Sequence, residues 1–344
     1  MQSKTSAITI PTKNEQNKRP HAERLEFLSD LSPKDKPADD HKEWAEKMST
    51  ALDAAGLARP SVRLRDCAEA LFFHLLADAH GELHRKLHSA PYCHYRHCPI
   101  CQWRRSLRNK AIVMAALPAV LEKYPSARFV MLTLTVRNCH LSELRGTIRG
   151  MNKGWQRLIQ REDWPALGWI RATEVTRAKD GAAHPHFHIL LMLPSTYFRG
   201  DKYVKTEEWA RRWREAARLD YDPVCDIRAV KAKAPAETTP GGDARMQAVR
   251  SAVSEVVKYA TKAADLLAGG PEWLAEYVEQ VRSLKFLTSG GVFKGIFKDQ
   301  RPDREDLVHV GGDEEDADGA VVQRLAFHWR TKHKRYARRH GNEA

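Results

Sequence analysis

The sequence predicts an α+β fold in which helices pack on a mostly antiparallel sheet. Three observations support this class. Apolar runs that suit strands occur at residues 128–137, 169–176 and 186–193. The second and third runs are separated by Lys179-Asp180-Gly181, a hairpin-turn sequence, so we expect them to be antiparallel neighbours. Amphipathic helices are expected at residues 142–160 and 206–219.

The other elements are expected in the following order along the chain. Residues 1–40 are rich in polar and charged side chains without periodicity, and we expect a disordered leader there. Further helices are expected at residues 41–57, 64–80 and 103–121. Another strand is expected at 222–231, before a loop rich in Pro and Gly. The sequence then predicts a helix at 251–267 and, after residue 300, a charged tail.

The composition favours a nucleic-acid partner. The chain of 344 residues carries a formal net charge of +13 and has a sequence pI of about 9.5. A basic excess of this size suits a polyanion such as DNA, and a basic membrane-surface protein is the alternative. The sequence has no apolar run long enough for a transmembrane helix, and its polar N-terminus lacks the apolar core of a signal peptide. We therefore expect a cytoplasmic protein without a membrane partner.

The most informative motif lies in the third apolar run, where His184 is followed by Pro185-His186-Phe187-His188. Side chains alternate between the two faces of a strand, so His186 and His188 share one face while Phe187 points into a core. Two neutral imidazoles on one face form half of a divalent-metal site. The alternative is a pair of buried core histidines, which is costly unless the two share a partner.

Such a site needs a third ligand. Glu174 is the best candidate, because it lies on the strand expected beside the histidine strand, where its carboxylate could face the imidazoles. His184 is the rival, because it shares the alternation face of His186. Imidazole and carboxylate ligands with open positions suit Mn²⁺ or Mg²⁺ bound to a phosphate oxygen.

The helix expected from residue 251 carries a second set of candidates. Its apolar stripe begins at Val253, whereas Glu255, Tyr259 and Lys262 lie away from that stripe. Glu255 and Tyr259 are four residues apart, so their carboxylate and phenol could serve one reaction centre. Considered alone, the segment is better explained as a surface tyrosine beside a solvated glutamate.

In combination these features resemble the HUH endonucleases and, more closely, the replication initiator (Rep) family of rolling-circle plasmids. The resemblance is carried, in that family's order, by residues 93–105 (CHYRHCPICQWRR), 129–136 (FVMLTLTV), 184–191 (HPHFHILL) and 255–262 (EVVKYATK). A fifth segment, at residues 287–294, resembles the family's glycine-rich C-terminal motif. The resemblance implies a central antiparallel sheet flanked by helices, with the histidine strand in its middle. Before that sheet we expect an N-terminal helical segment that resembles a zinc knuckle.

The resemblance also implies metal-dependent nicking and rejoining of plasmid origin DNA that is single-stranded at the nick site. Tyr259 would form a 5′-phosphotyrosine, and Glu255, one helical turn earlier, would activate water at termination. Lys262 would contact phosphate or stabilise the phenolate, and a solvated basic surface is its alternative. Three other tyrosines lack this context and are weaker candidates: Tyr197, Tyr203 and Tyr277. A host helicase and the replication machinery are implied partners, and a homodimer is left open.

Three of the six cysteines, Cys93, Cys98 and Cys101, have a spacing compatible with a zinc knuckle. In a chain of this length the cluster favours a bound metal over a disulfide framework. The fourth ligand is left open among five residues: Cys67, His84, His88, His94 and His97. A Zn²⁺ site here would order a basic loop beside Arg104 and Arg105, and the alternative is three reduced, partly buried cysteines.

These inferences divide the chain into a leader (1–40), a helical basic segment with the cysteine cluster (41–125), an HUH nuclease domain (126–300) and a charged tail (301–344). The strand around Thr133 is interpreted as scaffold, and three tryptophans are interpreted as core: Trp155, Trp209 and Trp213. Two other functions are kept open. One is a related HUH transposase or relaxase, and the other is a non-catalytic, zinc-containing DNA-binding protein whose histidines are structural.

Overall fold

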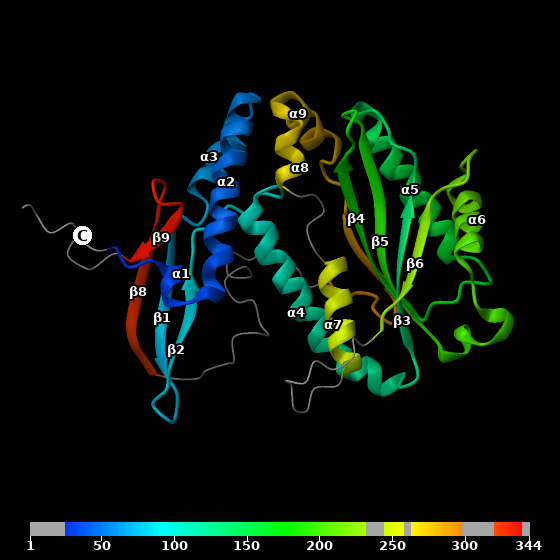
Figure 1. Cartoon of the computed structure of the whole chain (residues 1–344), viewed down its shortest axis with the longest axis horizontal. Helices are drawn as coiled ribbons and strands as arrows, with labels where there is room; N and C mark the ends of the chain where they lie inside the picture. Colours follow the sequence, from blue (N-terminus) through cyan, green and yellow to red (C-terminus); the bar gives the residue numbers. More distant parts are fainter. Residues whose placement is uncertain (1–24, 232–243, 258–262, 298–319, 339–344) are drawn as a thin grey trace, which may run out of the picture.

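The computed structural model describes residues 25–231, 244–257, 263–297 and 320–338 (Figure 1). Over these residues the chain forms an α+β structure with two antiparallel sheets, which confirms the predicted fold class. In Figure 1 the two sheets lie at opposite sides of the view, with several helices between them.

The larger sheet has five strands in the order β6-β3-β5-β4-β7, and every neighbouring pair is antiparallel. The strands are β3 (Arg128–Thr135), β4 (Gly168–Arg177), β5 (Ala183–Leu193), β6 (Cys225–Ala229) and β7 (Leu287–Gly291). The four strands expected in this region are confirmed, and the histidine strand β5 is central, as the resemblance implied. The β4–β5 hairpin turns at Gly181, whose φ of 89° favours glycine.

Helices cover both faces of this sheet. They are α5 (Leu144–Ile159) and α6 (Thr206–Ala217) on one face, and α4 (Pro99–Lys123) and α7 (Ala244–Val256) on the other. The first face buries the three tryptophans interpreted as core: Trp155, Trp209 and Trp213. That interpretation is confirmed, because large aromatic side chains at the helix–sheet contact supply much of the buried apolar area.

The histidines lie on the second face. Leu190 and Met192 of β5 pack there against Val253 of α7, together with residues of α4. Because side chains alternate along a strand, His186 and His188 continue this same face toward the beginning of β5. The sheet thus separates a purely structural face, under α5 and α6, from the face that carries the candidate site.

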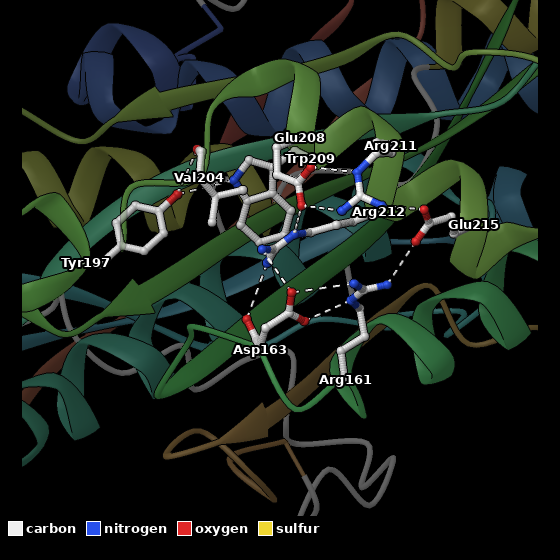
Figure 2. Close-up of polar contacts among 9 residues, drawn as sticks. All are labelled: Arg161, Asp163, Tyr197, Val204, Glu208, Trp209, Arg211, Arg212 and Glu215. Atoms are coloured by element: carbon white, nitrogen blue, oxygen red, sulfur yellow. Dashed lines mark hydrogen bonds and ion pairs between the residues drawn. The ribbon is translucent and has the colours of Figure 1, made fainter. Parts of the chain in front are cut away.

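An ion-pair network attaches α6 to the loop that follows α5 (Figure 2). Arg212 pairs with Glu208 of its own helix at 2.6 Å and with Asp163 of the loop at 2.9 Å. Arg161 of the same loop pairs with Asp163 at 2.8 Å and with Glu215 of α6 at 3.1 Å. Single exposed ion pairs contribute little to stability, but a connected network like this one fixes the helix relative to the loop.

The second sheet was not expected from the sequence. Its strands follow the order β2-β1-β8-β9, again all antiparallel. They are β1 (Ala70–Ala77), β2 (Leu83–Ser89), β8 (Ala320–Arg330) and β9 (Arg335–Arg338). The sheet therefore joins the N-terminal part of the chain to its C-terminal part.

Two predictions fail at this sheet. The helix expected at 64–80 is wrong beyond α3 (Ala58–Asp66), because the apolar run after it forms β1 and pairs with β8. The tail expected to be a charged extension is wrong for residues 320–338. Those residues form two strands, and three of their aromatic side chains are buried: Phe327, Trp329 and Tyr336.

The disordered leader predicted for residues 1–40 is also too long. Within the described residues the chain forms α1 (Leu28–Leu31), a 3₁₀ turn η1 (Pro33–Asp35) and α2 (Lys36–Ala54). Leu28 is fully buried, and Asp39 accepts a hydrogen bond of 2.9 Å from the backbone N–H of Tyr336 in β9. These contacts with the second sheet order a segment whose composition alone predicts disorder.

One apolar core connects the two sheets. It includes residues of α2, of α8 (Ala263–Ala268) and of α9 (Gly270–Gln280), and it reaches Val175 of β4. The helix expected at 251–267 corresponds to α7 and α8, and residues 258–262 between them lie outside the described residues. The remaining described elements are short 3₁₀ turns: η2 (Leu141–Glu143), η3 (Ser195–Phe198) and η4 (Gly200–Lys202).

Candidate metal centre

Glu174, His186 and His188 come together on the face of the sheet that α4 and α7 cover. The register of β4 and β5 places Glu174 directly opposite His186. A carboxylate oxygen of Glu174 lies 3.0 Å from Nε2 of His188 and 3.6 Å from Nε2 of His186. One ligand atom from each residue lies within 4.8 Å of the others, so a single cation could contact all three.

Both imidazoles are oriented by their Nδ1 atoms. Nδ1 of His186 lies 3.1 Å from the carbonyl oxygen of His184, to which it donates. Nδ1 of His188 lies 3.2 Å from Oγ1 of Thr133, its cross-strand neighbour on β3. These contacts leave both Nε2 atoms facing Glu174 and each other, 3.1 Å apart. A divalent cation that replaces the Nε2 protons would be held by two imidazoles and one carboxylate, so this donor set fits a divalent metal.

The charge of Glu174 suits the same role. Partial burial raises the pKa of its carboxyl group, but hydrogen bonds and charges from His186 and His188 outweigh this effect and lower the pKa to about 2. The carboxylate is therefore ionised at neutral pH. An anionic oxygen with two imidazoles is a donor set that binds Mn²⁺ or Mg²⁺ and leaves positions open for a phosphate.

The structure leaves His184 out of the cluster and brings Thr133 into contact with it. His184, the rival third ligand, is outside the cluster, and its Nδ1 lies 2.7 Å from the side-chain oxygen of Asn138. Thr133 was interpreted as scaffold only, yet its hydroxyl group contacts a candidate ligand. The missed signal was register, because β3 pairs with β5 such that Thr133 is opposite His188.

A cavity of about 460 Å³ lies at the beginning of β5 and reaches His184, whose ring centre is 5.1 Å from that of the cluster residue His186. It is lined by Thr135, Val136, Arg137, Asn138, His184, Tyr221, Asp222, Pro223 and Val224. The guanidinium of Arg137 stacks 3.8 Å from the ring centre of Tyr221, and the backbone N–H of Arg137 donates to the Tyr221 hydroxyl at 2.7 Å. A half-exposed aromatic ring beside a cation is a surface on which a nucleobase can stack.

The second candidate set is described only in part. Glu255 is exposed in the last turn of α7, whereas Val253 and Val256 on the same helix are buried against the sheet. Tyr259 and Lys262 lie outside the described residues. Of the weaker nucleophile candidates, Tyr197 and Tyr277 are buried in the apolar cores, and only Tyr203 is largely exposed.

The cysteines form a second cluster. The structure brings Cys93, Cys98 and Cys101 together and adds Cys67, with all four Sγ atoms within 4.8 Å of one another. The four histidines considered as the fourth ligand, His84, His88, His94 and His97, are outside this group. Hydrogen bonds from the thiols of Cys101, Cys67 and Cys98 lower the pKa of Cys93 well below its ordinary value.

Similarity to known proteins decides the family. A family described as "Replication protein" matches residues 84–337. The chain belongs to the Rep family of plasmid replication initiators. It is 31% identical over 263 residues to "Protein rep" of Lactiplantibacillus plantarum, covering 73% of this chain and 79% of the relative. It is also 32% identical to "Protein rep" of Bacillus amyloliquefaciens, covering 86% and 89% of the two chains.

A third relative, "Protein rep" of a Bacillus species, is 36% identical over 236 residues, covering 66% of this chain and 74% of the relative. No solved structure matches the chain. Among the described residues, no helix is both long enough and apolar enough to cross a membrane.

Proposed function

We propose that this replication initiator nicks and rejoins plasmid origin DNA for rolling-circle replication, through a metal-dependent HUH-type active site. The observation that carries the proposal is the convergence of Glu174, His186 and His188 on the central strands of the sheet. A structural histidine pair would not need a carboxylate beside two Nε2 atoms that face each other at 3.1 Å. The motif order along the chain supports the same activity.

Glu174, His186 and His188 would hold Mn²⁺ or Mg²⁺, and the bound ion would supply Lewis-acid polarisation of the scissile phosphate. Glu174 keeps one anionic ligand in place, because its pKa is lowered to about 2. The carbonyl of His184 and the hydroxyl of Thr133 hold the two imidazoles in the orientation that metal binding requires.

We assign the nucleophile to Tyr259. Its phenolic oxygen would attack the phosphorus while the bond from phosphorus to the 3′ oxygen breaks, and a proton would pass to that oxygen. The products would be a 5′-phosphotyrosine and a free 3′-OH that primes synthesis. The helix α7 supports this assignment, because it packs on the metal-cluster face and ends at Val256, three residues before Tyr259 in the sequence.

Glu255 and Lys262 would complete the reaction cycle. Glu255 would accept a proton from water, which then cuts the regenerated origin so that a second tyrosine is not required. Its exposure in the last turn of α7 leaves the carboxylate accessible to water. Lys262 would contact phosphate or stabilise the phenolate of Tyr259.

The cavity beside the cluster would receive the single strand. A base next to the scissile phosphate could stack on Tyr221, while Arg137 contacts the backbone phosphate. The net charge of +13 supports binding of origin DNA. A host helicase, a homodimer and action in the bacterial cytoplasm are further parts of this proposal.

The test is covalent capture of a single-stranded oligonucleotide that carries the origin nick site. With Mn²⁺ we expect a protein–DNA adduct on a denaturing gel, and we expect EDTA to abolish it. Tyr259→Phe should abolish the adduct, whereas the matched variant Tyr221→Phe, beside the cavity, should retain it. An adduct lost in Tyr221→Phe and kept in Tyr259→Phe would overturn the assignment of the nucleophile. DNA binding without any adduct would favour the non-catalytic alternative.

A further inference from the structure

The four clustered cysteines lie where three separate segments meet. Cys67 follows the last turn of α3, Cys93 lies in the loop after β2, and Cys98 and Cys101 begin helix α4. The Sγ of Cys101 lies 3.6 Å from that of Cys67 and 3.7 Å from that of Cys93. Four sulfurs around a tetrahedral Zn²⁺, each about 2.3 Å from the metal, are about 3.8 Å from one another. These two separations match a tetrathiolate site, and all four sulfurs lie within 4.8 Å of one another.

The surroundings stabilise negative charge on these sulfurs. The backbone N–H of Cys93 donates to Sγ of Cys67 at 3.3 Å, and the backbone N–H of Tyr95 donates to Sγ of Cys93 at 3.4 Å. Lys42 is fully buried beside the cluster, where its ammonium donates to the carbonyl of Cys67 at 2.8 Å and pairs with Glu69 at 3.1 Å. Arg105 donates to the carbonyl of His94 at 2.7 Å, so that a second cation is held near the cluster. The backbone N–H groups that donate to sulfur are the outer-shell contacts that a thiolate site requires.

We propose that Cys67, Cys93, Cys98 and Cys101 bind one structural Zn²⁺. With four protein ligands the site has no open position for substrate, which distinguishes it from the candidate nuclease site. Cys67, Cys98 and Cys101 are almost completely buried, and all four thiols are free of disulfides. The structure names Cys67 as the fourth ligand, which the sequence had left open.

The position of this site indicates what the metal does. Cys67 lies three residues before the start of β1 of the second sheet, and Cys101 lies in α4, which packs on the five-stranded sheet. The bound metal would therefore link the segment that leads into the second sheet to the helix that packs on the five-stranded sheet. The loop between Cys93 and Cys98 also contacts the rest of the protein, because Arg96 donates to the carbonyl of Val281 at 3.3 Å and stacks on Phe286.

The test uses the full chain in a His186→Ala/His188→Ala background, so that the candidate nuclease site contributes no metal. We expect one Zn²⁺ per chain by elemental mass spectrometry. Replacement by Co²⁺ should give the absorption of a tetrahedral site with sulfur-to-cobalt charge transfer. Cys67→Ser should weaken metal binding at least about 100-fold, whereas Cys139→Ser and Cys225→Ser, outside the cluster, should leave it unchanged.

Two further measurements keep the proposal falsifiable if Cys67→Ser fails to fold. Cys67→His retains a ligand, so it should still bind Co²⁺ but with fewer sulfur charge-transfer bands. In the metal-loaded protein, chelation should make four additional thiols reactive toward a disulfide reagent. The proposal is wrong if the folded chain carries no stoichiometric metal, or if the Co²⁺ spectrum does not change in Cys67→His. Neither result depends on whether the protein nicks DNA.

Discussion

At the scale of single residues, the candidate metal centre depends on how each imidazole is held. Nδ1 of His188 contacts only a side-chain hydroxyl group, that of Thr133, at 3.2 Å, whereas Nδ1 of His186 is held by a backbone carbonyl. A substitution leaves the backbone carbonyl of His184 in place, whereas a substitution of Thr133 can remove its hydroxyl group. His188 is therefore the ligand whose orientation a conservative substitution can disturb.

We expect Thr133→Val to weaken Mn²⁺ binding about 10-fold, because outer-shell partners of metal-bound histidines typically contribute 10–100-fold to affinity. Thr135→Val is the matched control. Thr135 lies on the same strand, but its hydroxyl donates to the carbonyl of Val224 at 2.8 Å instead of contacting an imidazole. Calorimetry without DNA measures both affinities, and Thr133→Ser should restore binding. Equal losses in the two valine variants would show that Thr133 does not act through His188.

At the scale of elements, the second sheet depends on a strand that local patterns did not predict. The outer part of β8 is exposed, with Val322 at 58% exposure, whereas Phe327 farther along the same strand is fully buried. Phe327 contacts Phe73 of β1 edge to face, with ring centres 5.7 Å apart. The half of β8 that contains Phe327 is therefore the part whose side chains stabilise the fold by packing.

Phe327→Ala should lower the free energy of unfolding by about 3–5 kcal/mol, the usual cost of removing a buried phenylalanine ring. Val322→Ala, on the same strand but exposed, should change it by less than about 0.5 kcal/mol. Urea unfolding of the two variants measures both values. Similar small changes in both would mean that residues 320–338 contribute little to the folded core, as the sequence had predicted.

The elements that the sequence predicted correctly share one property, which is that their signals are local. The sequences of β4 and β5 each show the apolar pattern of a strand, and a short turn joins them. Glu174 and His186 could therefore be placed on neighbouring strands from the sequence alone. β1 could not be identified in this way, because its apolar run is short and its partner β8 is distant in the sequence. Cys67 was left undecided for the same reason, since its distance in sequence from Cys93 hides their contact.

At the scale of the whole molecule, the five-stranded sheet divides the protein into two functional sides. The side under α5 and α6 consists of apolar core and the ion-pair network of Figure 2. The other side, together with the adjoining end of β3 and β5, carries the metal cluster and the cavity. A net charge of +13 draws DNA to the molecule as a whole, so charge alone does not say which side the strand contacts.

The salt dependence of DNA binding distinguishes the two sides. Each phosphate that the protein neutralises on a single strand contributes about 0.7 to the slope of log affinity against log salt concentration. Arg137 lines the cavity, its side chain is 65% exposed, and its ion pair with Asp220 spans 3.8 Å, so Arg137→Gln should weaken binding and reduce the slope by about 0.7. Arg211 is also exposed, but it lies on α6 and pairs with Glu208 at 2.7 Å, so Arg211→Gln should leave the slope unchanged. Fluorescence anisotropy with a labelled single strand, measured over a range of KCl concentrations, provides both slopes. A reduced slope in Arg211→Gln alone would place the DNA on the side covered by α6, on the opposite face of the sheet from the cluster, and would contradict the proposed active site.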